Sequence, residues 1–392
     1  MAKKLKKLCI ITGSRAEYGL LKEIIRMAND DKDIELCLVV TASHLSNELG
    51  YTVDEIRQDG IPISYEIEML IGSDTPRAIT KSSATLMIGL ADLLEKERPE
   101  CVLLLGDRYE IHAACTSTML ANIPIAHIHG GELTQGLIDD SIRHSITKMS
   151  HIHFVVAETY RRRIIQMGED PKYIYNVGGL GVDAIKNTSI KDKRTLEREI
   201  GFDFGEKSLI VTHHPTTLKT ASDNKEEIES IIKALELHSD INLLFTGVNA
   251  DTYSRVIFDT VKKFCSRRRN AIIVNSLGKD RYFSCLAYAD GVLGNSSSGI
   301  MEVPYFKKST INIGDRQAGR IRMPSIIDCG TGVKEISEAI DRLFSPDQQI
   351  LVSQMHSFPY GYGGASNQII EILKNLDTRD LTTKKFNDIM SK

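Results

Sequence analysis

The segment Gly291-Val-Leu-Gly-Asn-Ser-Ser-Ser-Gly-Ile-Met-Glu302 decides the fold, because it joins an apolar strand to a helical pattern through a loop of glycine and serine. Gly294 and Gly299 permit a tight turn and a close approach of the backbone to a ligand. A helix that follows such a loop directs its unpaired N–H groups toward it, and Ser296 and Ser297 add hydroxyl donors. The segment therefore predicts a phosphate-binding loop in an α/β protein.

Two charged residues accompany this loop. Glu302 closes the segment, and Arg316 follows a second short strand in Ile313-Gly-Asp-Arg316. A guanidinium binds phosphate oxygens through two parallel hydrogen bonds, which an ammonium group does not reproduce. The alternative for the segment taken alone is a turn in which serine only caps a helix.

Composition limits the class of protein. A chain of 392 residues, 42% hydrophobic and 26% charged, exceeds the size at which one core usually keeps growing, so two domains are expected. The net charge of -3, without a basic stripe, argues against nucleic acid as a partner. The seven cysteines lack C-x-x-C spacing, which predicts reduced thiols in a cytoplasmic protein. No segment approaches the roughly 20 apolar residues that span a bilayer, so no membrane partner is expected.

Apolar runs alternate with amphipathic helical patterns along most of the chain, which predicts parallel sheets covered by helices. The alternation restarts after residue 178. The predicted strands are Leu8–Thr12, Ile34–Thr41, Cys101–Leu105, Ile123–Ile128 and Phe154–Ala157, then Ser208–Thr212, Ile241–Thr246, Ala271–Asn275, Gly291–Leu293 and Thr310–Ile313.

This restart predicts two Rossmann-like α/β domains. We place an N-terminal domain at residues 1–178 and a C-terminal domain at residues 179–358. The remaining residues, 359–392, are predicted to form a helix that crosses back to the first domain, followed by a polar tail. A central cleft between the two domains is expected to hold a small ligand, because such interfaces are common binding sites.

Polar residues follow the predicted strands of the first domain. Arg15 comes after the first strand in a loop without G-x-G-x-x-G spacing, which disfavours a nicotinamide cofactor. Asp107 and Arg108 come after the third strand, at the edge where open α/β sheets bind ligands. The alternatives are a solvated Arg15 and an ion pair between Asp107 and Arg108.

Further carboxylates are predicted to gather at the same edge. Glu132 follows the next strand, and Asp139 or Asp140 begins the next helix. Three carboxylates at one mouth are unfavourable unless cations offset them or one carboxyl keeps a proton, and enzymes use such clusters for acid/base chemistry. The structural alternative is that Asp139 or Asp140 only caps the helix.

Two histidines are candidate ligand-binding residues. His129 alternates with His127 on one strand, a spacing that metal sites also use, but no third ligand stands out and no metal is expected. His214 ends the first strand of the second half, where an imidazole can donate to a phosphate or a sugar hydroxyl. A satisfied structural histidine is the alternative at that position.

Five motifs in this order resemble the hydrolysing UDP-N-acetylglucosamine 2-epimerases of sialic acid synthesis, over nearly the whole chain. The motifs are Gly13-Ser-Arg-Ala-Glu-Tyr-Gly19, Gly106-Asp-Arg-Tyr-Glu110, His127-Ile-His-Gly-Gly-Glu132, Ile142-Arg-His-Ser-Ile-Thr-Lys148 and Gly294-Asn-Ser-Ser-Ser-Gly299. The resemblance implies a glycosyltransferase-B-like fold in which the second domain binds the nucleotide and the first faces the sugar. It also implies a homodimer or homotetramer.

The resemblance assigns roles to residues of this chain. The catalytic residues it implies are Asp107, Glu132 and Asp139. The substrate-binding residues it implies are Arg15, Arg108, His129, His214, Asn249, Leu277, Ser296, Ser297, Glu302 and Arg316.

The implied reaction converts UDP-GlcNAc and water to ManNAc and UDP. The C2 proton leaves as the bond from C1 to the diphosphate breaks, which gives 2-acetamidoglucal, and water then adds with protonation of C2 from the opposite face. A positioned acid/base group contributes ~10²–10⁴-fold to such a step. No cofactor is implied, because the overall reaction is not a redox reaction.

Several alternatives remain open. Animal relatives tend to carry His-Ile-Glu-Gly-Gly-Glu where this chain has His129, so either His129 or Glu132 is the candidate base. The alternative substrate is UDP- or GDP-linked 2,4-diacetamido-2,4,6-trideoxyglucose, on a route to legionaminic acid. A non-hydrolysing epimerase, a glycosyltransferase and a catalytically silent nucleotide-sugar binder are further alternatives.

Overall fold

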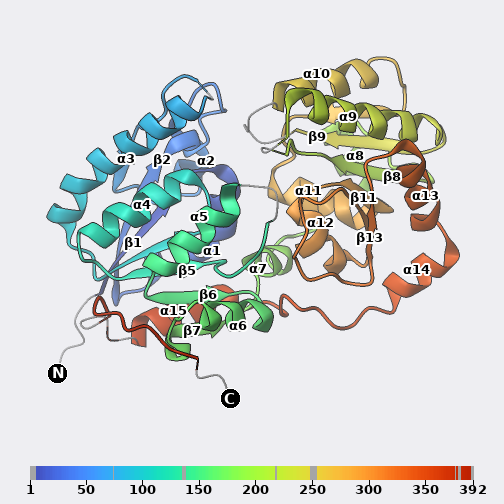
Figure 1. Ribbon diagram of the computed structural model, residues 1–392. Helices are drawn as coiled ribbons and strands as arrows, with labels where there is room; N and C mark the ends of the chain where they lie inside the picture. Colours follow the sequence, from blue (N-terminus) through green and yellow to red (C-terminus); the bar gives the residue numbers. More distant parts are fainter. Residues whose placement is uncertain are drawn as a thin grey trace. The chain divides into compact units, whose positions relative to one another are not determined.

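The chain divides into two compact units. The computed structural model describes residues 6–73, 75–134, 138–216, 219–247, 254–375, 377 and 381–389 (Figure 1). Unit 1 comprises Met1–Glu132, Asp139–Ala184 and Tyr360–Lys392, and unit 2 comprises Leu133–Ile138 and Ile185–Pro359. Both units are α/β structures with parallel sheets, which confirms the predicted fold class.

Unit 1 is built on a sheet that, among the described residues, has seven strands in the order β3-β2-β1-β4-β5-β6-β7. All neighbouring strands pair in parallel. The order reverses between β1 and β4, which makes the carboxyl ends of these two strands the switch point of the sheet. The strands are β1 Lys6–Thr12, β2 Ile34–Thr41, β3 Tyr65–Ile67, β4 Cys101–Leu105, β5 Ile125–Ile128, β6 Ile152–Val155 and β7 Ile174–Asn176.

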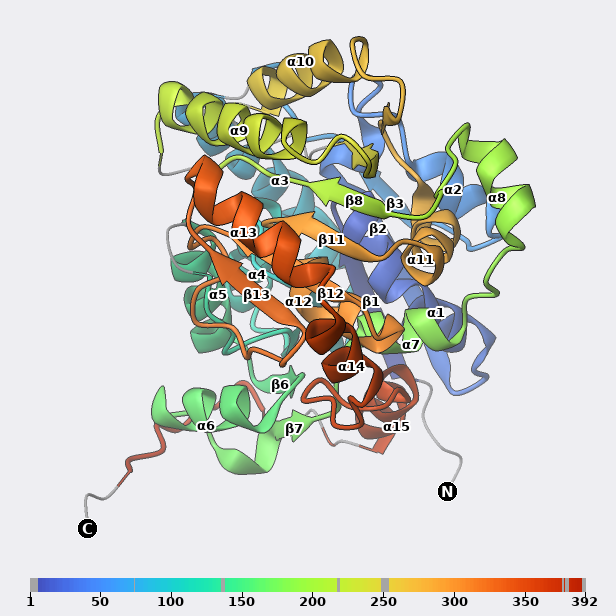
Figure 2. The same cartoon turned by 90° about the vertical axis from the view of Figure 1, so that its right-hand side faces the viewer.

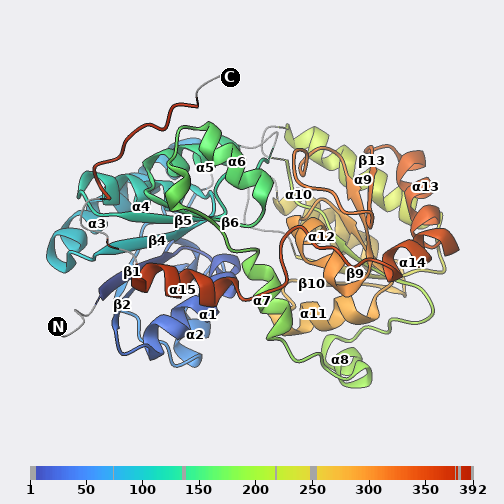
Figure 3. The same ribbon diagram turned by 90° about the horizontal axis from the view of Figure 1, so that it is seen from below.

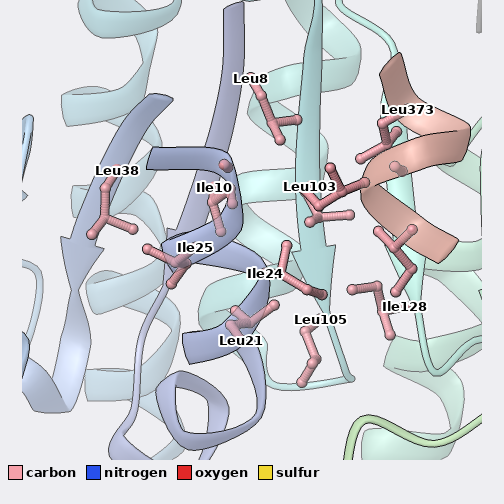
Figure 4. Close-up of a cluster of buried hydrophobic side chains, with 14 of the residues drawn as sticks. Leu8, Ile10, Leu21, Ile24, Ile25, Leu38, Leu103, Leu105, Ile128 and Leu373 are labelled. Carbon is pink, nitrogen blue, oxygen red and sulfur yellow. The ribbon is translucent and has the colours of Figure 1, made fainter. Parts of the chain in front are cut away.

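Helices cover both faces of this sheet (Figure 3). On one face, Leu21, Ile24 and Ile25 of α1 and Leu373 of α15 pack against strand residues such as Leu103 (Figure 4). The other face is covered by α3 and α4. The helices of unit 1 are α1 Arg15–Asp30, η1 Ala42–Leu45, α2 Val53–Gln58, α3 Pro76–Glu97, α4 Tyr109–Leu120, α5 Ile138–Met149, α6 Glu158–Gln166, η2 Pro171–Tyr173, α7 Leu180–Lys186 and α15 Ala365–Asn375, of which α5 and α7 extend slightly into the bounds of unit 2.

Unit 2 has, in its described part, a six-stranded parallel sheet in the order β10-β9-β8-β11-β12-β13. Its switch point lies between β8 and β11. Figure 2 shows α9 and α13 lying across one face, where their apolar side chains join those of the strands in one core. The strands are β8 Ser208–Thr212, β9 Asn242–Thr246, β10 Ala271–Val274, β11 Gly291–Gly294, β12 Ser309–Ile313 and β13 Ile326–Cys329. The helices are α8 Lys193–Ile200, α9 Ala221–Glu236, α10 Ser254–Cys265, α11 Gly278–Tyr288, α12 Ser297–Met301, η3 Val303–Phe306, α13 Val333–Leu343 and α14 Pro346–Ser353.

Seven of the ten predicted strands differ from the observed strands by one or two residues at one or both ends, and two of these differences have identifiable reasons. Strand β5 begins at Ile125 rather than Ile123, because Pro124 has no N–H for the ladder and Asn122 turns the chain with a φ of 56°. Strand β6 ends at Val155, and Ala157 already precedes α6. The strands that the sequence patterns missed, β3, β7 and β13, are short and lie at sheet edges.

The chain after α15 is fastened to unit 1. The Lys384 ammonium lies 2.6 Å from the Glu169 carboxylate and donates to the carbonyls of Lys148 and Ser150 at the end of α5. The Phe386 ring lies against Gly168, where a Cβ would meet it at 2.3 Å. This tail is therefore part of the packed structure. In the described part of the chain, no helix is both long and apolar enough to cross a membrane.

Candidate active site

The switch point of unit 1 gathers charged side chains from three segments. Asp107 follows β4, Glu132 follows β5, and Asp140 lies in the first turn of α5. Gly106, with a φ of 84°, turns the chain directly after β4 and so exposes Asp107 at the strand end. Two of the carboxylates that the sequence placed at one sheet edge, Asp107 and Glu132, therefore follow neighbouring strands of that sheet.

Arg143 connects these carboxylates. Its guanidinium, which is 4% exposed, donates to the Asp107 carboxylate, and it lies 3.8 Å from Asp140. Burial alone lowers the pKa of Arg143, but the charges of Asp107, Glu132, Asp140 and Asp139 raise it above the ordinary value. Arg143 is thus a permanent cation that offsets the cluster.

Glu132 pairs with His129 across a tight turn. Nδ1 of His129 lies 2.8 Å from a Glu132 oxygen; the Glu132 side chain is buried and that of His129 is 12% exposed. His129 has a φ of 69°, a left-handed conformation that is rare for a residue with a Cβ. Such a residue is held there by its surroundings, which is common at active sites. The two alternative candidates for the base therefore form one imidazole–carboxyl pair.

The remaining part of this cluster comes from α5. His144 Nε2 lies 3.6 Å from Asp140, and burial lowers the pKa of His144. Asp139 occupies the same first turn as Asp140 and adds to the negative charge that Arg143 experiences. The sequence left open whether Asp139 or Asp140 belongs to the carboxylate cluster. Asp140 lies within ion-pair distance of both Arg143 and His144.

The two arginines predicted to bind substrate have different partners. Arg108 donates through Nε to Glu110 at 2.6 Å. The alternative in which Asp107 pairs with Arg108 is wrong, because the guanidinium that donates to the Asp107 carboxylate is that of Arg143. Arg15, at the start of α1, pairs with Glu55 of α2 at 2.8 Å.

Unit 2 places its polar loops at its own switch point. Asn295, directly after β11, accepts from the backbone N–H of His214 at 2.7 Å and donates to the His214 carbonyl at 2.8 Å. The Asn295 carbonyl in turn accepts from Arg316 at 3.0 Å and from Gln317 at 2.9 Å. Burial, then the charge of Arg316, lowers the pKa of His214 well below its ordinary value, so this imidazole is neutral at pH 7.

This arrangement depends on Gly294. Its φ is 141°, and a Cβ there would lie only 1.8 Å from the Thr212 carbonyl oxygen of β8. Only glycine therefore allows the two switch-point strands to approach so closely. The sequence argument for a close backbone approach at this glycine is consistent with that geometry.

The serine loop differs from the expected strong helix terminus. Ser296 caps α12, but α12 ends at Met301 after little more than one turn, because Pro304 shortly after it cannot donate a backbone hydrogen bond. Because α12 is so short, its dipole is small, and the loop hydroxyls and amides are the main donors that the loop offers to a phosphate. Glu302 accepts from the Ser298 hydroxyl, which also lies 2.7 Å from the Tyr282 hydroxyl.

Sequence reasoning missed several of these residues. Tyr282 stands apart from the motifs, and Gln317 directly follows Arg316 but is uncharged, so neither was recognised before the fold placed them at the loop. Ser298 lies inside the motif, but its bond to Glu302 depends on helical spacing of four residues. Ser297 begins α12. Leu277 is buried before α11, and Asn249 lies outside the described residues.

A metal ion requires a cluster of ligating side chains. Among the described residues, no group of three or more His, Cys, Asp or Glu side chains is placed to hold an ion. His127 hydrogen-bonds the Gly106 carbonyl at 2.8 Å, and burial lowers its pKa to about 3. His127 is therefore a neutral structural histidine behind Asp107.

Two parallel-sheet α/β units with polar loops at both switch points define a protein of the glycosyltransferase-B type. Residues 26–374 match the family described as UDP-N-acetylglucosamine 2-epimerase. The chain belongs to this family.

Similar proteins agree with this assignment. The chain is 37% identical to GDP/UDP-N,N'-diacetylbacillosamine 2-epimerase (hydrolyzing) of Campylobacter jejuni, over 98% of this chain and 99% of that one. It is 36% identical to polysialic acid biosynthesis protein P7 of Escherichia coli, over 98% of each chain. The structure of UDP-GlcNAc 2-epimerase from Neisseria meningitidis bound to UDP-GlcNAc superposes with a TM-score of 0.80 at 18% identity, over 94% of this chain and 99% of that chain, and shows the likeness of fold.

Proposed function

We propose that this protein is a hydrolysing 2-epimerase that converts UDP-GlcNAc and water to ManNAc and UDP, the first step of a sialic acid pathway. The observation that carries the proposal is the cluster in which the Arg143 guanidinium offsets Asp107 and Asp140 beside the His129–Glu132 pair. Family membership and the relative with "hydrolyzing" in its name, 37% identical over almost the whole chain, support it.

In the proposed reaction, the unit 2 cluster binds the nucleotide diphosphate. Arg316 and the serine hydroxyls are the donors to phosphate, since guanidinium and hydroxyl groups suit phosphate oxygens. His214 is neutral, so it acts as a hydrogen-bond donor or acceptor rather than as a charge. Glu302 accepts a hydrogen bond from the Ser298 hydroxyl. In the proposed complex, the ribose hydroxyls of the substrate donate to the same carboxylate.

The unit 1 cluster acts on the sugar ring. The C2–H bond is too weakly acidic to lose its proton unless the bond from C1 to the diphosphate breaks with it, and positive charge then develops at C1. The Asp107 carboxylate, which accepts from the buried Arg143 guanidinium, stabilises that charge. The His129–Glu132 pair and Asp139, in the turn of α5 that also carries Asp140, are the acid/base groups that remove the C2 proton and return one to the opposite face.

A second substrate has support from the comparisons. The Campylobacter jejuni relative is named for N,N'-diacetylbacillosamine, whose 4-acetamido group distinguishes it from GlcNAc. The relative at 36% identity is named for polysialic acid synthesis, which favours the first substrate. The same acid/base cluster serves either sugar, because the chemistry takes place at C1 and C2.

One experiment separates these possibilities. The protein is incubated with UDP-GlcNAc and, separately, with UDP- and GDP-linked 2,4-diacetamido-2,4,6-trideoxyglucose in D₂O, and products are followed by NMR. Free ManNAc with deuterium at C2, together with UDP, is the expected result. Turnover of a diacetamido sugar but not of UDP-GlcNAc would identify the diacetamido sugar as the substrate. Release of UDP-ManNAc would identify a non-hydrolysing enzyme instead.

A further inference from the structure

Two buried glutamates, Glu17 of α1 and Glu110 of α4, meet at the backbone of Gly13. Glu17 is 5% exposed and Glu110 is 1% exposed. The Gly13 N–H donates to Oε2 of Glu17 at 2.7 Å. A Cβ at Gly13 would lie 2.7 Å from Cγ and 3.1 Å from Oε1 of Glu110. The two carboxyl groups thus contact the same glycine, at the switch point between β1 and β4.

The hydrogen bonds of this pair are incomplete. Oε1 of Glu110 accepts from Arg108 Nε at 2.6 Å, whereas Oε2 of Glu110 and Oε1 of Glu17 are buried without a hydrogen-bond partner among the described residues. Two ionised carboxylates in one buried site repel each other strongly. One proton held between them removes the repulsion and supplies the missing hydrogen bond, because a protonated carboxyl is a donor.

We propose that Glu17 and Glu110 share one proton, as a carboxylic acid beside a carboxylate, and that this pair fixes the direction of the Arg108 guanidinium. The inference rests on the proposed function in one respect, namely that Arg108, a substrate-binding residue according to the family resemblance, contacts the diphosphate of the proposed substrate. Both glutamates are positioning residues, since they act through Arg108. When Nε of an arginine donates to Glu110, the pair of Nη atoms is directed away from that acceptor, and two such N–H groups suit two phosphate oxygens.

The proton belongs to Glu17. Burial, followed by the negative charge of Glu110, raises the pKa of Glu17 to about 8. Glu110 instead has the Arg108 guanidinium as a direct partner at 2.6 Å, and we assign it the carboxylate of the proposed pair. At pH 7 the pair therefore carries one negative charge, and the amide introduced by Glu17→Gln is a close mimic of the protonated carboxyl group.

Three neighbouring groups, His44, Tyr18 and Tyr109, have pKa values that burial shifts away from neutral pH. His44 of η1 lies 3.2 Å from the Thr12 hydroxyl at the end of β1, and burial lowers its pKa to about 4. Burial raises the pKa of Tyr109 on α4 to about 12, and burial with the neighbouring Asp59 raises that of Tyr18 on α1 even further. The further charged neighbours are Arg108 beside Glu110, the Arg15–Glu55 pair between α1 and α2, and Lys22 beside Asp59.

The sign of the pH dependence follows from the raised pKa of Glu17. A carboxyl group with a pKa of 4.5 in the unfolded chain and about 8 in the folded one contributes stability that is fully present below pH 4.5. That stability is lost as the pH rises through 8. Glu17→Gln abolishes the loss, because the amide keeps an acceptor for the Gly13 N–H and a donor for Glu110 but does not ionise.

The test compares Glu17→Gln, Glu110→Gln and the unchanged chain. Thermal midpoints are measured at pH 5 and pH 8.5 without ligand, and UDP affinity is measured by calorimetry at pH 6.5. Glu17→Gln should show a smaller fall in midpoint between the two pH values and keep its UDP affinity within about twofold. Glu110→Gln should weaken UDP binding about tenfold or more, since it loses a charge-assisted hydrogen bond. Glu95→Gln, an exposed i,i+3 partner of Arg98, is the matched control.

The outcomes test the shared proton and the proposed function separately. If Glu17→Gln falls in midpoint as steeply as the unchanged chain, or loses UDP affinity as severely as Glu110→Gln, the shared proton is disproved. If Glu110→Gln fails to fold, the midpoints and affinity of Glu17→Gln still decide the question. If the unchanged chain does not bind UDP, the proposed function fails, whereas the ligand-free midpoints still test the proton pair.

Discussion

Arg143, on α5, donates a hydrogen bond to Asp107, at the carboxyl end of β4. This contact joins a helix that carries two acidic residues in its first turn to the strand end where a third, Asp107, lies half-buried. Because the guanidinium is buried and stays charged, it offsets the negative charge of carboxylates that would otherwise repel one another. The charge balance of the proposed catalytic cluster therefore depends on Arg143.

We predict that Arg143→Lys lowers kcat at least about tenfold while UDP affinity changes little. Lysine is a point charge and does not reproduce the simultaneous contacts of the guanidinium with Asp107 and Asp140. Steady-state kinetics and UDP calorimetry provide the measurements. Arg162→Lys, at an exposed position on α6, is the matched control and should behave as the unchanged chain. A full kcat in Arg143→Lys would contradict the proposed role.

Glu132→Gln should lower turnover by ~10²–10⁴-fold, the usual contribution of a positioned acid/base group. The amide keeps the size of the side chain and its contact with His129, so the fold should be retained. Exchange of the C2 hydrogen in D₂O, followed by NMR, is the direct measurement, and it should fall with turnover. If exchange persists while product formation stops, Glu132 acts after proton removal and His129 becomes the stronger candidate for the base.

Gly294→Ala and Gly19→Ala should have opposite effects on stability. At Gly294, a Cβ would overlap the Thr212 carbonyl at 1.8 Å in a backbone conformation with a φ of 141°. Gly19 lies inside α1 with nothing within 4 Å of its Cβ position, so alanine there should stabilise the helix by about 0.5–1 kcal/mol. Thermal denaturation should show a lowered midpoint for Gly294→Ala and a slightly raised one for Gly19→Ala. If Gly294→Ala left the thermal midpoint unchanged, β8 and β11 would have to be able to move apart.

Much of the fold could be predicted from sequence, because buried parallel strands are continuous apolar runs. Ile34–Thr41, Cys101–Leu105 and Ser208–Thr212 have the predicted bounds. The predicted site residues after β4 and β5 lie at one sheet edge for the same reason, since parallel strands end together. Edge strands such as β3 have mixed polarity and few residues, so they left no signal.

The partners of the charged residues could not be predicted. Sequence proximity suggested that Asp107 pairs with Arg108, but the turn at Gly106 directs Asp107 toward Arg143, and Arg108 pairs with Glu110. The shared contact of Glu110 with Gly13 joins two motifs far apart in the chain, and only the pairing of β1 with β4 brings them together. The polar composition of the tail likewise gave no indication that Lys384 would reach Glu169.

The attachment of the tail gives the last prediction, for Lys384→Met. Burial alone would raise the pKa of Glu169, but hydrogen bonds from His153, Lys148 and Lys384 lower it to about 2. A carboxyl group with such a lowered pKa contributes stability above pH 4.5 that is lost as the pH falls toward 2. Lys384→Met removes one partner of Glu169 and the donor to the final carbonyls of α5, so it should lower the thermal midpoint at pH 7.

The pH dependence distinguishes this ion pair from packing alone. The difference in thermal midpoint between Lys384→Met and the unchanged chain should be full at pH 6 and should narrow below about pH 4.5, where Glu169 in the unfolded chain becomes protonated. Lys385→Met, at the exposed neighbouring position, is the matched control and should leave the midpoint unchanged. A difference that stays constant with pH would show that the methylene groups of Lys384, rather than its charge, hold the tail. Because α5 also carries Asp140 and Arg143, a charge-dependent loss should be accompanied by a reduced kcat at temperatures below the midpoint.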